Sequence, residues 1–74
     1  MKNIQYCSSR AVVRHLRSVR IRRNYSQEFV AERLGISQEA YSRLELHETT
    51  PSIDRLLQIG RILGVPPEEL VITI

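Results

Sequence analysis

The sequence predicts an all-α protein, a compact domain of five short helices. Serines precede runs of apolar residues spaced three or four apart, which is the pattern of a capped amphipathic helix. Asn24, Gly35 and Gly64 stand where these runs stop, and both residue types adopt the left-handed backbone that ends helices. Strict apolar alternation occurs only near Ile4–Tyr6 and in the tail VITI. We therefore expect no sheet.

The chain has 74 residues, which suits one domain. We expect an N-terminal extension at 1–8, the helical domain at 9–71 and an apolar C-terminal tail at 72–74. The tail either folds back onto the core or meets another subunit, and both interpretations stay open. Cys7 is the single cysteine, the first ten residues lack the apolar core of a secretory signal, and no run approaches a membrane span. We expect a cytoplasmic protein with no membrane contact.

The first helix is expected to follow Ser8 or Ser9 as its cap and to run to about Arg23. Asn24 can close it in the left-handed conformation. Its buried stripe is formed by Val12, Leu16 and Val19.

The second and third helices are expected to form a helix-turn-helix. Ser26 caps the second helix, Gly35 ends it, and Ser37 caps the third. Apolar anchors on the two helices are Phe29, Val30, Ala31, Leu34, Ala40, Tyr41 and Leu44. The polar side chains left to face a partner are Gln38, Glu39, Ser42 and Arg43. A DNA-reading motif needs this division, with one bracing helix and one helix that enters the major groove.

The fourth helix is expected to be the central core element. Ser52 caps it, Gly64 ends it, and a loop over 47–50 precedes it. Its apolar residues are Ile53, Leu56, Leu57, Ile59, Ile62 and Leu63. Proline suits the first helical position, so Pro66-Pro67 predicts a fifth short helix that continues to Val71.

Positive charge is concentrated in the first third of the chain. Residues 1–25 hold seven cations and no acid, whereas residues 26–74 hold four arginines and eight acids, so a segment of +7 precedes one of −4. Arginine outnumbers lysine ten to one, and its guanidinium suits phosphates and guanine edges. The asymmetry favours a nucleic-acid partner over a merely solvated basic face.

Several motifs in order resemble one known family. They are Leu16-Arg17-x-x-Arg20, Tyr25-Ser26-Gln27-Glu28, the run from Ala31 to Ser37, the run from Tyr41 to Glu45, Pro51-Ser52-Ile53 and Leu63-Gly64-Val65. Together, from about Val12 to Val71, they resemble the lambda-repressor/Cro-like, or XRE-type, helix-turn-helix DNA-binding domain. The resemblance implies double-stranded DNA as the partner.

The resemblance also implies roles for individual residues. Gln27 matches a glutamine that contacts a DNA phosphate and braces the recognition helix, and Ser37 matches a cap that also touches phosphate. Arg20 and Glu45 match a buried ion pair. Positions that face base edges or neighbouring phosphates are matched by Gln38, Glu39, Ser42 and Arg43. An alternative for Arg43 is an ordinary surface pair with Glu39 at i, i+4.

The chain departs from the family pattern after the third helix. Leu46, His47 and Glu48 stand where the family usually carries Asn-Gly and a basic residue, and Glu48 would repel a phosphate. We therefore expect the phosphate contacts to shift toward Arg22 and Arg23. Arg10 and Arg14 are expected to lie too far from the groove.

Three classes of function compete. The first is a sequence-specific DNA-binding transcription regulator, a repressor that binds a pseudo-palindromic operator as a homodimer. The second is a protein-interaction module, such as an antitoxin that binds a toxin, or the partner of an antirepressor; Leu46, Glu48 and the tail favour it. The third is an enzyme, which we do not expect, because no nucleophile–base pair or carboxylate constellation is present. His15 and His47 lack companion ligands, so no metal or cofactor is expected.

Overall fold

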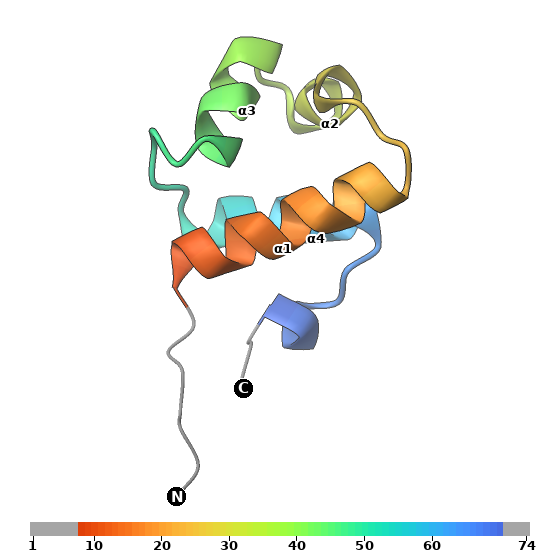
Figure 1. Ribbon diagram of the computed structural model, residues 1–74, viewed down its shortest axis with the longest axis vertical. Helices are drawn as coiled ribbons and strands as arrows, with labels where there is room; N and C mark the ends of the chain where they lie inside the picture. Colours follow the sequence, from red (N-terminus) through yellow and green to blue (C-terminus); the bar gives the residue numbers. More distant parts are fainter. Residues whose placement is uncertain (1–7, 71–74) are drawn as a thin grey trace, which may run out of the picture.

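Four α-helices and one 3₁₀-helix make up the described part of the chain, residues 8–70 of a computed structural model. They are α1 (Ser9–Arg22), α2 (Gln27–Leu34), α3 (Gln38–Glu45), α4 (Ile53–Leu63) and η1 (Pro67–Leu70). Helices α1 and α4 pack together in the middle, with α2 and α3 on one side and η1 on the other (Figure 1). The predicted extension, apart from Ser8, and the tail lie outside the described residues.

The prediction of a fifth α-helix is wrong in one respect. The segment after Pro66-Pro67 is the 3₁₀-helix η1, four residues long, with a hydrogen bond of 3.0 Å from Glu69 N to Pro66 O. Proline has no N–H, and so short a segment does not complete the i to i−4 bonds of an α-helix. The all-α class stands for residues 8–70, with four α-helices in place of five.

All four α-helices between residues 8 and 70 begin at a serine. In each case the serine side-chain oxygen accepts a hydrogen bond from the backbone N–H three residues later, at 2.9–3.1 Å. This contact satisfies one of the amides that a helix leaves unpaired at its start. The four caps are Ser8, Ser26, Ser37 and Ser52.

The same four helices end in one motif, the Schellman motif. In α3, His47 N donates to Leu44 O at 3.1 Å and Glu48 N donates to Arg43 O at 2.9 Å, with His47 in the left-handed conformation at φ 63°. The corresponding bonds close the other three helices. The left-handed residues are Asn24, Gly35, His47 and Gly64. Three of these four are the asparagine and glycines expected from the sequence.

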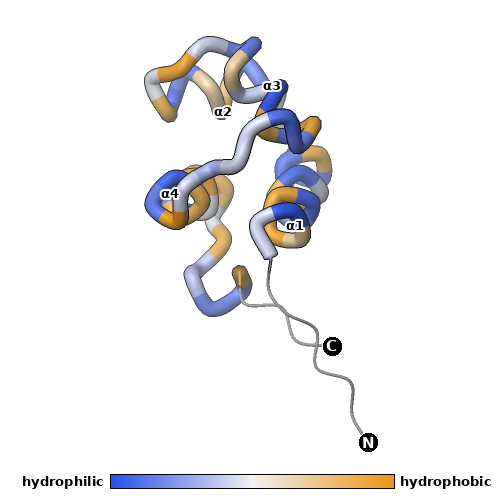
Figure 2. The backbone as a smooth tube through the Cα atoms, turned by 90° about the vertical axis from the view of Figure 1, so that its left-hand side faces the viewer, coloured by the Kyte–Doolittle hydropathy of each residue, from blue (hydrophilic) through white to orange (hydrophobic). Residues whose placement is uncertain are grey.

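The core lies between α1 and α4 and beneath α2 and α3, and apolar and polar segments alternate along α1 and α4 (Figure 2). Among its fully buried side chains are Leu16, Tyr41, Ile59 and Leu63. Two expected apolar anchors are exposed instead. Ile53 is 76% exposed because it opens α4 at the loop, and Ala40 lies on the outer side of α3.

Gly60 allows the chain to return close to α4. Val65 N donates to Gly60 O at 2.7 Å, and a Cβ atom at position 60 would lie only 3.0 Å from Val65 O. A side chain here would push the backbone after α4 away from the helix. Within residues 8–70, no helix is both long enough and apolar enough to cross a bilayer.

Candidate nucleic-acid interface

Helices α2 and α3 are joined by three residues, 35–37, which leave no slack in the angle between them. Gly35 turns the chain in the left-handed conformation, Ile36 packs partly against the core, and Ser37 caps α3. The inner side of α3 is formed by the buried residues Tyr41, Leu44 and Glu45. The outer side carries Gln38, Glu39 and Arg43 in the open, with Ser42 partly buried at its edge. Four of the side chains predicted to face DNA therefore share one helix and leave its buried face to the core.

A buried carboxylate holds the C-terminal end of α3. Glu45 has a side chain only 2% exposed, and Arg20 of α1 forks onto it. Arg20 Nε donates to Glu45 Oε2 at 2.7 Å, and Arg20 Nη2 donates to Glu45 Oε1 at 2.9 Å. A bidentate arginine–carboxylate contact is both directional and strong. The ion pair that the resemblance implies is thus present between α1 and α3.

Two further contacts extend this pair into α2. Gln27 Nε2 donates to Glu45 Oε1 at 2.9 Å, and Arg20 Nη1 donates to the Tyr25 backbone oxygen at 2.8 Å. Arg17 Nε lies 3.8 Å from Glu45 Oε1, but its side chain is 56% exposed. The network joins α1, the segment before α2, the first residue of α2 and the last residue of α3. It therefore fixes where α3 sits on the domain.

The charges in this network shift one another's pKa values. Burial acts to raise the pKa of Glu45, but hydrogen bonds from Arg20, Gln27 and Tyr41 outweigh it and hold that pKa below its usual value. The hydrogen bond to Glu45 raises the pKa of Arg20 against the opposing effect of burial. Burial, followed by the neighbouring Glu45 carboxylate, raises the pKa of Tyr41. Glu45 and Arg20 are therefore both charged at neutral pH, and Tyr41 is protonated.

The outer face of α3 carries an ion pair of a different kind. Arg43 Nη2 lies 3.4 Å from Glu39 Oε2, and the two side chains are 56% and 77% exposed. This is the i, i+4 surface pair that the sequence left open as an alternative for Arg43. Solvent screens such a pair strongly, so it holds Arg43 only weakly.

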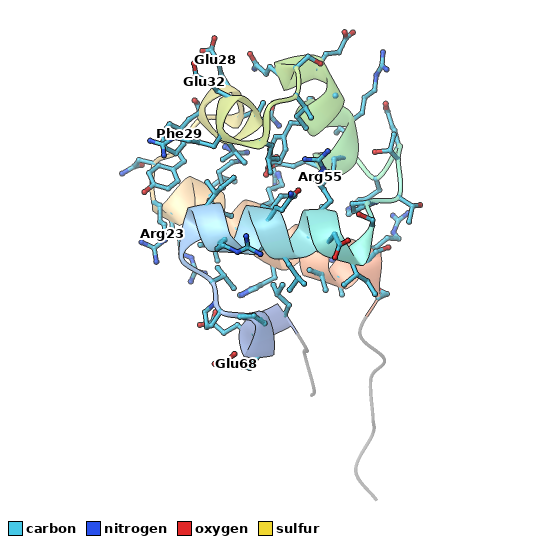
Figure 3. All side chains as sticks on the ribbon, turned by 180° about the vertical axis from the view of Figure 1, so that it is seen from behind. Arg23, Glu28, Phe29, Glu32, Arg55 and Glu68 are labelled. Atoms are coloured by element: carbon cyan, nitrogen blue, oxygen red, sulfur yellow. The ribbon has the colours of Figure 1, made fainter. Side chains whose placement is uncertain are left out.

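The residues predicted to contact phosphate lie in two places. Gln27 and Ser37 lie at the N-termini of α2 and α3, where unpaired backbone amides favour anions. Arg22 and Arg23 line a hollow with Gly64 and Glu69 near η1. Figure 3 shows Arg23 on the side of the molecule away from α3. The structure therefore separates these two arginines from α3, and their phosphate contact stays a prediction.

Arg10 lies closer to α3 than the sequence suggested. The first turn of α1 packs beside the segment that follows α3, so Arg10 lines a hollow together with His47, Thr49 and Thr50. No local sequence pattern could have revealed this, because the two segments are nearly 40 residues apart. Elsewhere in residues 8–70, no group of three or more histidine, cysteine or carboxylate side chains is placed to hold a metal ion.

The fold, the serine-capped α2–α3 unit and the buried pair behind it define a helix-turn-helix domain. A sequence model of the helix-turn-helix family matches residues 16–70, which is most of the chain. The chain therefore belongs to the helix-turn-helix family of the XRE, lambda-repressor/Cro-like type.

One curated relative comes from Bacillus subtilis (strain 168). It is described as an SPbeta prophage-derived uncharacterized HTH-type transcriptional regulator, YonR, and it is 32% identical over 56 residues. The match covers 76% of this chain and 52% of the relative, so the chain spans about half the length of that protein. No solved structure matches the chain.

Proposed function

We propose that the protein is a sequence-specific DNA-binding transcription regulator that places α3 in the major groove. One observation carries the proposal: the buried Arg20–Glu45 pair fixes the inner side of α3, while the outer side presents Gln38, Glu39 and Arg43 to solvent. A helix held in this way presents its polar side chains in a defined register, as base reading requires. The description of the Bacillus relative as a transcriptional regulator supports the same function.

The chemistry of the outer face suits base edges. A guanidinium matches O6 and N7 of guanine, so Arg43 is the proposed guanine reader. Gln38 can grip adenine through N6 and N7, and Glu39 can accept from cytosine N4. Ser42, at the edge of the same face, reaches either a base or a phosphate. Exchanging the Glu39 contact of Arg43 for a guanine costs little, because that ion pair is exposed and long.

Phosphate contacts then position the helix. We assign them to Gln27 and Ser37, whose backbone amides lie at the N-termini of α2 and α3. Arg22 and Arg23 contribute through the positive field of α1, since they point toward η1. Replacing both by glutamine should lower the association rate at low salt more than at high salt.

The regulator is proposed to act as a homodimeric repressor. One recognition helix reads only a few base pairs, so two copies on a pseudo-palindrome, with half-sites roughly 34 Å apart, would supply a specific site. The candidate contact is the apolar tail, which lies outside the described residues. Sedimentation of a protein lacking residues 72–74 tests this role, and an unchanged dimer would exclude the tail.

Selection of bound duplexes from a random DNA pool tests the function itself. The proposal expects a recurring pseudo-palindromic site, and Arg43→Ala should relax the preference at one base pair in each half. A protein that retains no duplex even at low salt is not a DNA-binding regulator.

A protein-interaction module, such as an antitoxin component or the target of an antirepressor, is the second candidate. Leu46 favours it, because this side chain is 63% exposed directly after α3, with Glu48 beside it. An apolar and acidic end to the recognition helix suits a protein surface better than a phosphate. Co-purification with a partner encoded nearby, abolished by Leu46→Ser but not by Arg43→Ala, would move this candidate to first place.

A further inference from the structure

The hollow between the first turn of α1 and the segment after α3 is lined by hydrogen-bond donors. Its seven lining residues include three hydroxyls, one guanidinium and one imidazole, and none of the seven is acidic. Val13 and Pro51 form its apolar part. The lining residues are Ser9, Arg10, Val13, His47, Thr49, Thr50 and Pro51.

We infer that this hollow binds a phosphate of the DNA backbone beside the groove that α3 enters. The inference rests on the proposed DNA-binding function and adds a site to it. Arg10 supplies the charge, because guanidinium groups bind phosphate oxygens through paired N–H donors. The hydroxyls of Thr49 and Thr50 and the imidazole N–H of His47 supply neutral donors around it.

The backbone of His47 gives independent support. Its φ of 63° lies in the left-handed region, where an L side chain is strained and glycine is not. Three of the four Schellman motifs in the described chain carry asparagine or glycine at this position. The chain nevertheless places an imidazole here, and that imidazole lines the hollow together with Arg10. Strain retained at a donor-lined hollow points to a use for the side chain.

The hollow is also rigidly tied to α3. The amides of His47 and Glu48 donate to Leu44 and Arg43 in the last turn of that helix. A phosphate bound here would therefore set the depth and angle of α3 relative to the duplex. Glu48 is exposed and is not one of the lining residues, so it weakens the local positive potential without filling the hollow.

A salt titration of DNA binding tests the site, with a fluorescent duplex of mixed sequence as the probe. Arg10→Gln should weaken binding on the order of tenfold at about 50 mM salt and reduce the slope of log K against log salt by about 0.9, the value for one phosphate. The matched control is Arg14→Gln, which removes the same charge one turn further along α1, outside the hollow. Its slope should stay near that of the wild type. Equal effects of the two variants would mean a general charge effect and would overturn the site.

His47→Gly provides a second and opposite readout. Because glycine relieves the left-handed strain, this variant should melt no lower than the wild type and yet bind the duplex more weakly. A lower melting temperature with weaker binding would assign His47 a structural role only. If the wild type binds no duplex at all, the proposed function fails. If the wild type binds and both Arg10→Gln and His47→Gly bind equally well with unchanged slopes, only the phosphate site fails.

Discussion

Two arginine–glutamate pairs involve α3, and they differ in almost every physical respect. Arg20 and Glu45 meet through two short hydrogen bonds, with side chains 11% and 2% exposed. Arg43 and Glu39 meet through one contact of 3.4 Å between exposed side chains. The first pair joins segments 25 residues apart, and the second lies within one helix. The same two residue types thus hold α3 in place on one side and remain available to a partner on the other.

The largest expected effect is on the buried pair. Arg20→Ala should lower the free energy of unfolding by about 3–5 kcal/mol, because it leaves Glu45 charged and buried without its main partner. Urea denaturation of Arg20→Ala, Glu45→Ala and the double variant forms a thermodynamic cycle that isolates the coupling. Simple additivity of the two single losses would contradict an energetic link between the two side chains. The matching cycle on Arg43 and Glu39 should show coupling below about 1 kcal/mol.

The comparison also predicts a pH dependence. The pKa of Glu45 is lowered in the folded state, so its stabilisation is complete above its unfolded value of about 4.3 and is lost as pH falls through the lower folded value. Wild-type protein should therefore lose stability on acidification more steeply than Glu45→Gln, which cannot titrate at that position. Urea midpoints at pH 7 and about pH 3 measure this. Parallel losses in the two proteins would mean that Glu45 is not the titrating group.

A smaller effect, on affinity and not on folding, is expected from the exposed pair. Arg43→Ala should cost about 1–3 kcal/mol of DNA binding and relax one base preference per half-site, with an unchanged melting temperature. Binding to a panel of single-base operator variants gives both quantities. A uniform loss on all variants would instead mean that Arg43 contacts phosphate.

The smallest expected effect concerns Glu39. Glu39→Gln should lower stability by only about 0.3–0.5 kcal/mol, as for other exposed i, i+4 pairs. It should still change DNA affinity, because it frees Arg43 and removes a charge that phosphates repel. Thermal melting and duplex binding of the same protein separate these two effects. A melting loss as large as that of Arg20→Ala would erase the distinction between the two pairs.

Local chemistry explains which parts of the fold the sequence could predict. Serine caps and the left-handed residues Asn24, Gly35 and Gly64 mark helix ends through interactions within a few residues, so the boundaries of α1, α2 and α4 follow from the sequence. His47 ends α3 in the same way, yet histidine is no stop signal, and only a loop was predicted there. The fifth helix was overpredicted, because a proline pair starts an α-helix and a 3₁₀ turn equally well.

The candidate site was less predictable where it depends on tertiary packing. The outer residues of α3 could be read from helical spacing, but Ala40 was assigned to the core and is exposed. The contact of Gln27 with Glu45 fixes a bracing role that only the resemblance suggested. Arg10 was placed too far from α3 because its neighbours in space come from the loop nearly 40 residues later. Charge along the sequence could show that α1 is basic, but not which arginines face α3.

The short connections between the first three helices bear on how the domain folds. Four residues join α1 to α2 and three join α2 to α3, so these helices find one another through local loops that close at little entropic cost. The Arg20–Glu45 contact instead closes a loop of 25 residues. We expect refolding within milliseconds, as for other helical domains rich in local contacts, with this ion pair forming after the main barrier. Arg20→Ala should then accelerate unfolding in stopped-flow measurements while leaving the refolding rate nearly unchanged.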